Sequence, residues 1–217
     1  MSVTLYSSYW RSFGAVIFTS SQNWTVPPGV FKIKVIAIGG GGGGGGGYST
    51  TYTGGNGAAG VTVYAEMLVA PGTELGIIIG AGGTGGTGGS SPTAGGNGGA
   101  TEITFGGNVV LFVTGGGGGG AATASANGSN ASAPLLGNQY TGFQGASTPV
   151  FPLFLFQTSI SGVNAVLLNP TINGQGSTYG NPYSQSNLSY GSGGFGGGVN
   201  QNGTNGISGV VVIWWGD

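Results

Sequence analysis

Nine consecutive glycines, residues 39–47, directly follow an apolar, β-branched stretch at 32–38. A second run of six glycines, 115–120, follows a similar stretch at 109–114. Because glycine loses more backbone entropy on ordering than any other residue, a chain that uses it in long runs needs compensating interactions. The two apolar stretches can supply them as strands. The alternation predicts a β scaffold that carries Gly-rich segments as packed extended chains or as its working surface.

Short apolar or alternating stretches bounded by Gly, Pro and Asn recur along the chain, whereas helices are hard to find. Such a pattern predicts an all-β protein, with a β-sandwich or jelly-roll-like scaffold and little or no helix. The expected strands are 16–18, 31–38, 61–69, 75–79, 101–105, 109–114 and 210–215.

Residues 82–90 repeat with a period of three, Gly-Gly-Thr-Gly-Gly-Thr-Gly-Gly-Ser. Helices of the polyproline-II type have three residues per turn and no internal hydrogen bonds. Without side chains they can pack side by side and exchange backbone hydrogen bonds, which satisfies groups that are costly to bury unpaired. The period therefore predicts packed polyglycine-II-like segments. A flexible Gly/Ser tract is the alternative that the sequence leaves open.

Residues 121–190 differ from the rest, because glycine becomes sparser and apolar stretches appear at 149–156 and 163–168. We therefore divide the chain into an N-terminal arm at 1–15, a glycine-rich β domain at 16–120 and 191–217, and an insertion or subdomain at 121–190. The stretch 149–156 is expected to form the core of that subdomain or a contact between subunits. Its two prolines argue against a central strand.

Charged side chains are almost absent: the 217 residues include three Lys or Arg, four Asp or Glu, and no His or Cys. Ordinary soluble domains carry about 25% charged residues, and a surface this neutral tends to associate. We therefore expect a homo-oligomer or a fixed place in a larger particle. No stretch approaches 18 consecutive apolar residues, so no membrane span is expected, and no export leader is recognisable at the N-terminus.

The same composition argues against catalysis. A dinucleotide-binding fingerprint needs a helix after its glycines, and nine glycines followed by residues 48–53 cannot begin a stable one. Without His or Cys, acid–base chemistry would depend on the scattered residues Glu66, Glu74 and Glu102, and metal sites need clustered ligands. Three cations do not make the basic surface that nucleic acids require. We expect no enzyme, no cofactor, no metal and no nucleic-acid partner.

Tyrosines in Gly-, Ser- and Asn-rich surroundings are the candidates for recognition, since rigid aromatic anchors among small polar neighbours are typical of adaptable binding loops. Filling gaps between extended chains or between subunits is an equally good explanation. The tyrosines of this kind are Tyr48, Tyr52, Tyr140, Tyr179, Tyr183 and Tyr190. The last four lie in or at the end of the divergent segment 121–190, and we take them as the candidate contact residues.

Several motifs, taken in order, resemble the glycine-rich domain of phage tail-fibre and tail-tip proteins. These are Trp24-Thr-Val-Pro-Pro-Gly-Val30 before the long glycine run, Ala70-Pro-Gly72 followed by Gly76-Ile-Ile-Ile-Gly-Ala-Gly-Gly83, and the closing stretch 206–213. The resemblance covers about 16–120 and 191–215 and carries over no catalytic residue.

This resemblance implies a structural virion protein, a tail, fibre or surface-appendage component located in the virion. Its partners would be copies of itself, other virion proteins and a glycan or protein of the host surface. The competing hypothesis is a subunit of a cellular extracellular filament or a surface adhesin.

Overall fold

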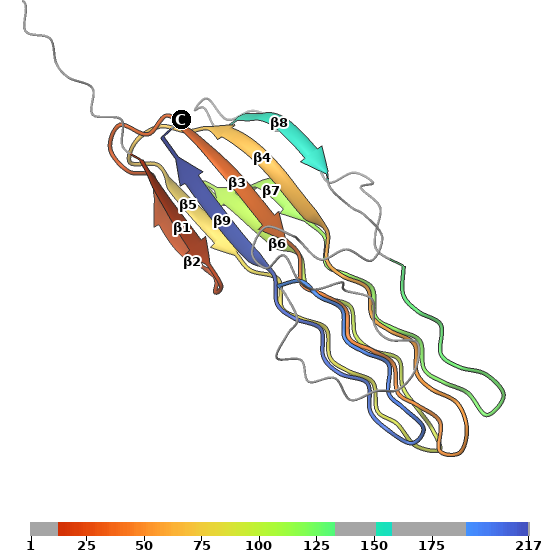
Figure 1. Ribbon diagram of the computed structural model, residues 1–217. Helices are drawn as coiled ribbons and strands as arrows, with labels where there is room; N and C mark the ends of the chain where they lie inside the picture. The colour runs from red at the N-terminus through yellow and green to blue at the C-terminus, as the bar shows by residue number, and fades with distance from the viewer. Residues whose placement is uncertain (1–12, 133–150, 158–189, 217) are drawn as a thin grey trace, which may run out of the picture.

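The computed structural model describes residues 13–132 and 190–216, together with the backbone of 151–157. These residues form two antiparallel sheets and no helix. The sheets face one another as a sandwich, and a bundle of extended Gly-rich segments projects from one end (Figure 1). The expected all-β sandwich is confirmed. We call the bundle the shaft, its far end the tip, and the opposite end of the sandwich the base.

Five strands form the first sheet, in the order β1-β9-β3-β4-β8. Their bounds are β1 (Gly14–Phe18), β3 (Lys32–Ile38), β4 (Thr62–Leu68), β8 (Phe151–Gln157) and β9 (Val210–Trp215). Four strands form the second sheet, in the order β2-β5-β6-β7. Their bounds are β2 (Gln22–Thr25), β5 (Glu74–Ile78), β6 (Thr101–Phe105) and β7 (Asn108–Val113).

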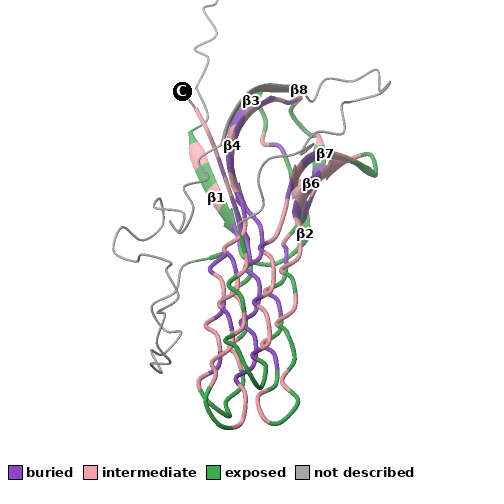
Figure 2. Cartoon of the chain, turned by 90° about the vertical axis from the view of Figure 1, so that its right-hand side faces the viewer, coloured by how far each residue is buried: buried purple, intermediate pink, exposed green. Residues whose placement is uncertain are grey.

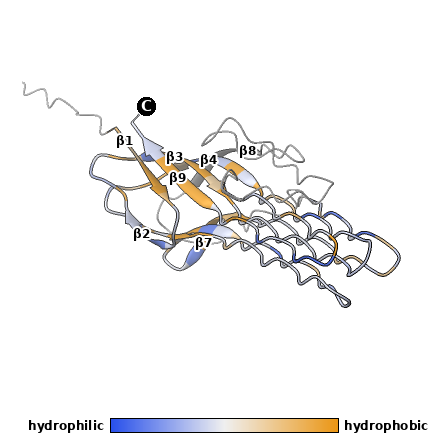
Figure 3. Ribbon diagram, turned by 60° about the horizontal axis from the view of Figure 1, so that its bottom comes forward, coloured by the Kyte–Doolittle hydropathy of each residue, from blue (hydrophilic) through white to orange (hydrophobic). Residues whose placement is uncertain are grey.

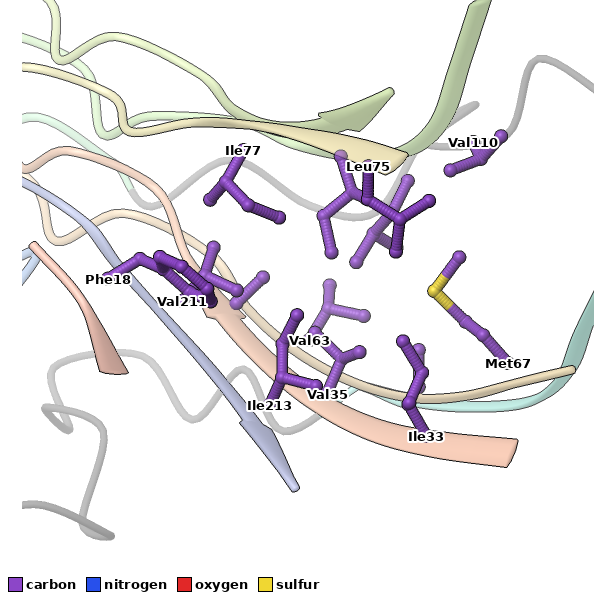
Figure 4. Close-up of a cluster of buried hydrophobic side chains, with 14 of the residues drawn as sticks. Phe18, Ile33, Val35, Val63, Met67, Leu75, Ile77, Val110, Val211 and Ile213 are labelled. Atoms are coloured by element: carbon purple, nitrogen blue, oxygen red, sulfur yellow. The ribbon is translucent and has the colours of Figure 1, made fainter. Parts of the chain in front are cut away.

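The sandwich core fills the space between the two sheets. Burial alternates along β4, whose side chains at Val63, Ala65 and Met67 are buried and those between them are not. Ile33 and Val35 from β3 meet the inward side chains of β4, β5 and β9 in one aliphatic cluster (Figure 4). Branched aliphatic side chains suit the half-buried pleated surface of a strand. The core is therefore conventional, and the glycines lie outside it.

All seven expected strands are present, with ends shifted by up to two residues. Two further strands, β2 and β8, were not expected. Strand β8 pairs with β4 at the edge of its sheet, where a proline such as Pro152 is tolerated because no outer strand needs its missing N–H.

The described part of 121–190 is tied to the scaffold. Residues 121–132 belong to the shaft, because Ala122 N–H donates to Gly46 and Gly120 N–H donates to Ser129. These hydrogen bonds join 121–132, the beginning of the predicted insertion, to the shaft. The apolar stretch 163–168 lies outside the described residues.

Among the described residues, eight extended segments make up the shaft, and they alternate in direction away from and back toward the sandwich. They are 39–47, 54–60, 80–88, 93–100, 115–122, 127–132, 191–198 and 201–209. The central one, 39–47, is buried over its whole length (Figure 2). Backbone alone therefore forms the centre of the shaft.

Candidate functional site: the glycine shaft and its tip

The central segment 39–47 exchanges hydrogen bonds with six surrounding segments. Its N–H groups donate in rotation to 54–61, 93–99 and 201–207, with N···O distances of 2.8–3.0 Å. Its carbonyls accept, also in rotation, from the other three neighbours, 80–89, 115–122 and 191–197. This rotation follows from three residues per turn. The prediction of packed polyglycine-II-like segments is confirmed, and the flexible-tract alternative is wrong for 82–90.

Every position of the central segment requires glycine for a steric reason. A Cβ atom built on any of the nine would lie closer than 3.0 Å to a backbone carbonyl oxygen of a neighbouring segment, which real Cβ atoms essentially never do. At Gly43 the obstructing atom is the carbonyl oxygen of Thr84, and at Gly44 it is that of Phe195. The uninterrupted run is therefore a packing requirement.

The six segments that surround 39–47 also bond to one another and close a ring. Segment 54–60 donates to both 115–120 and 191–197, 93–99 donates to both 115–119 and 80–87, and 201–209 completes the circle between 80–86 and 191–198. On 80–88 the outward position recurs every third residue and carries Ala81, Thr84 and Thr87, all exposed. On this segment the ring therefore leaves room for side chains only at the outward positions.

Polar side chains on the flank of the shaft accept hydrogen bonds from its backbone. Asn97 Oδ1 accepts from Gly118 N–H at 2.9 Å, and Asn202 Oδ1 accepts from Gly88 N–H at 2.7 Å. These amide oxygens replace the carbonyls that a further outer segment would have offered, and so satisfy outward N–H groups. The other side chains that accept from shaft N–H groups in this way are Asn56, Thr93, Asn130, Thr204 and Asn205.

Thr101 joins the shaft to the sandwich. Its side chain is buried, its hydroxyl donates to the Ile38 carbonyl at 2.7 Å, and the same oxygen accepts from Gly80 N–H at 3.0 Å. Ile38 is the last residue of β3 before the glycine run, and Thr101 begins β6. Both sheets are therefore coupled to the root of the shaft.

At the tip, three loops converge on the loop 48–53. Tyr48 accepts from Asn200 N–H at 2.9 Å through its backbone carbonyl and forms a β-bridge with Gly89. Asn127 from the loop after 115–122 accepts from Thr53 N–H at 2.9 Å. Asn200 has φ of 60°, a region in which Asn is enriched among non-glycine residues. The loops therefore have a fixed arrangement at the end of the shaft.

The acidic side chains are separated from one another on the sandwich. Glu66 Oε2 lies 3.6 Å from Lys32 Nζ, and its Oε1 accepts from the Tyr64 hydroxyl at 3.0 Å. Burial, followed by this hydrogen bond and the charge of Glu66, raises the pKa of Tyr64. Glu74 accepts from Asn23 Nδ2 at 2.9 Å on the other sheet. Within 13–132 and 190–216, no three potential metal ligands of the His, Cys, Asp or Glu type come together.

The candidate tyrosines are only partly placed. Tyr140, Tyr179 and Tyr183 lie outside the described residues. Tyr190 is 37% exposed and directly precedes segment 191–198, which begins beside Ile38 at the root of the shaft, far from the tip. Tyr48, at the end of the glycine run, is joined to the other tip loops through its backbone.

The base presents exposed aromatic side chains. Phe13 is 71% and Phe31 is 64% exposed. They precede β1 and β3, the two strands that flank β9, and Phe13 lies against Gly216 beyond the end of β9. Hydrophobic residues are concentrated in the sandwich, whereas the shaft is mostly close to neutral in hydropathy (Figure 3). None of the described residues forms a helix suited to crossing a membrane.

In a comparison with known families, residues 17–216 match the model described as "Glycine-rich domain". A search of curated proteins finds no significant match. The family match includes the end of the opening strand β1, all described shaft segments and the closing strand β9. The match covers most of the chain, which therefore belongs to the glycine-rich domain family.

Proposed function

We propose that this protein is a structural component of a virion surface appendage, such as a tail or fibre, mounted through its base with the shaft pointing outward and the tip engaging the host surface. The observation that carries the proposal is the polarity of the molecule. Exposed phenylalanines mark one end, and uncharged polar loops mark the other. Exposed apolar patches are typical of protein–protein contacts, so the base is suited to assembly.

The shaft supports the same orientation. Its central segment 39–47 consists of backbone alone, held by hydrogen bonds with no side chains to repack, so its length and direction are fixed by the lattice. Loops held on a rigid scaffold are where binding function concentrates. A rigid spacer that carries such loops away from a base with exposed phenylalanines suits attachment across a gap between particle and host.

Low charge favours a constitutive place in an assembly. Charge repulsion between copies is weak when the formal net charge is −1, and near-neutral proteins associate readily. We propose homo-oligomers or contacts with other virion proteins through the base. Light scattering on the purified protein tests this part, because a stable monomer at high concentration would contradict it.

The location is tested by electron microscopy with two peptide tags, one inserted in the tip loop between Thr50 and Thr51 and one at the base turn Gly106–Gly107. We expect gold-labelled antibody to reach the tip tag on intact particles and to reach the base tag poorly. Labelling of cell-surface filaments in place of particles would favour the alternative, an extracellular filament subunit or adhesin. Equal labelling of both tags on particles would contradict the orientation.

A further inference from the structure

The polar side chains of the tip differ from those of the flank in what they bind. On the flank, Asn and Thr side chains accept from backbone N–H groups. At the tip, by contrast, the Thr53 hydroxyl donates to Asn127 Oδ1 at 3.4 Å, but none of the other hydroxyl groups in the loops 48–53 and 89–92 takes part in a hydrogen bond to a described residue. They belong to Tyr48, Ser49, Thr50, Thr51, Tyr52, Ser90 and Ser91. The tip therefore holds hydrogen-bonding capacity that the fold does not use.

The tip is also free of formal charge. No Lys, Arg, Asp, Glu or His occurs in the described shaft or its loops, at 39–60, 79–100, 114–132 and 190–209. A charged ligand is normally held by an opposite charge or a charge-assisted hydrogen bond, which this surface cannot provide from side chains. A lipid surface would require an apolar face, and Val199 is the one large hydrophobic residue of the described tip loops that is markedly exposed, at 41%. The partner that fits is neutral and polar.

The loops are also held in place before any ligand arrives. Tyr48 N–H donates to the Tyr52 carbonyl at 2.8 Å, so the loop closes on itself, and Asn200 and Gly89 fix it to two neighbouring loops. Tyrosine supplies a large amphipathic ring at low cost in conformational entropy, and hydroxyls both donate and accept hydrogen bonds. An aromatic face beside several unused hydroxyls complements a sugar ring, which has an apolar C–H face and a rim of hydroxyls.

We infer that the tip formed by loops 48–53, 89–92 and 199–200 is a binding surface for neutral saccharides. The inference rests on the proposed function, since the tip must face outward to meet such a partner. The interaction is non-covalent, with tyrosine packing against the sugar ring and serine and threonine hydroxyls bonding to its rim. Because no ion pair takes part, binding is expected to be insensitive to salt.

The test uses the purified full-length protein on immobilised neutral oligosaccharides of glucose, galactose, mannose and N-acetylglucosamine, with sialylated and sulfated glycans on the same surface. We expect binding to at least one neutral class, changed less than about twofold between about 0.05 and 1 M salt, where screening changes most. Tyr52→Ala and the double variant Thr50→Ala/Thr51→Ala should each weaken it at least about tenfold. Thr84→Ala, an exposed hydroxyl on the flank of the shaft, is the matched control and should bind like the natural protein.

Melting temperatures of all variants separate loss of binding from loss of fold, and the double hydroxyl variant leaves the Tyr48–Tyr52 backbone bond in place. Binding only to charged glycans, binding only to a protein, binding unaffected by the tip variants, or no binding to any neutral saccharide would each overturn the inference. Any of these results could coexist with tip labelling on intact particles, so failure here is distinguishable from failure of the proposed function.

Discussion

Replacing Gly43 by alanine tests the central claim about the shaft, that its interior has no room for a single side chain. Gly43 lies in the middle of the central segment, donates to Gly96 at 2.8 Å and accepts from Gly119 at 2.8 Å. The new Cβ would collide with the Thr84 carbonyl oxygen. That carbonyl accepts from Gly96 N–H at 2.8 Å, so it cannot move without breaking a bond of a second neighbour.

The expected cost follows from these contacts. Loss of about two buried backbone hydrogen bonds contributes roughly 1–1.5 kcal/mol each, and overpacking contributes about 1–3 kcal/mol. We expect Gly43→Ala to lower the free energy of unfolding by about 4 kcal/mol, a large share of the typical 5–15 kcal/mol. For a chain of this length, the melting temperature should fall by about 8–16 °C.

Gly117→Ala provides the matched control within the same kind of segment. Gly117 faces a groove beside Ser132, and the nearest atom to a Cβ there is that of Ala131, at 3.5 Å. Because glycine-to-alanine changes at permissive sites reduce the entropy of the unfolded chain, a change between zero and a gain of about 1 kcal/mol is expected. Calorimetry and denaturant titration of both variants measure the difference. Equal and small effects would refute the packed-lattice reasoning.

Other changes should follow the same geometry. Gly85→Val places a Cβ against a neighbouring backbone carbonyl and should lower the melting temperature well beyond Thr84→Val at the adjacent exposed position. Asn97→Ala leaves an outward N–H without its acceptor and should cost about 1 kcal/mol in denaturant titration, whereas Asn97→Asp, which keeps an acceptor oxygen, should cost less. Stability should change little from pH 7 down to about pH 3, because the chain has no His and four acidic side chains, and an acid transition above that pH would contradict this. The pKa of Tyr64 is raised in the folded protein, so folding favours the protonated hydroxyl. The stability that this contributes to the fold is fully present below the ordinary tyrosine pKa of about 10 and is lost as the pH rises through the folded pKa. Tyr64→Phe should remove that alkaline decline in stability.

The strands of the sandwich could be predicted from the sequence where they are rich in β-branched residues. Strand β2 gives a weak signal, since Trp24 is its one large apolar residue and its neighbours are exposed. Strand β8 is hidden by its prolines, which are tolerated because it lies at an edge. Strand β2 pairs with β5 and strand β8 pairs with β4, and such pairing between strands distant in sequence gives little local signal in the sequence.

The tip was harder to predict than the shaft. The threefold period at 82–90 predicts an extended segment, and the same period of glycines at 203, 206 and 209 is a signal that could have identified its partner 201–209. Which loops meet at the far end, however, depends on the closed ring of segments around 39–47. Tyr48 could be placed at the end of a rigid run, but its contacts with Asn200 and Gly89 come from pairing between segments distant in sequence.

The rotation of hydrogen bonds also constrains how such a shaft can change in length. Successive N–H groups of 39–47 donate in turn to three different segments, and successive carbonyls accept in turn from three others. Inserting one glycine would therefore turn every later residue toward the wrong neighbour, whereas inserting three restores the register one turn further on. Three residues add about 9 Å, and those added to the central segment alone would have no surrounding carbonyls or N–H groups to pair with. Lengthening the shaft thus requires the insertion of three residues in the central segment and in every surrounding segment together. The inserted residues must be glycine at every position of the central segment and at every inward position of the others. The sequence of the tip loops, in contrast, can vary freely.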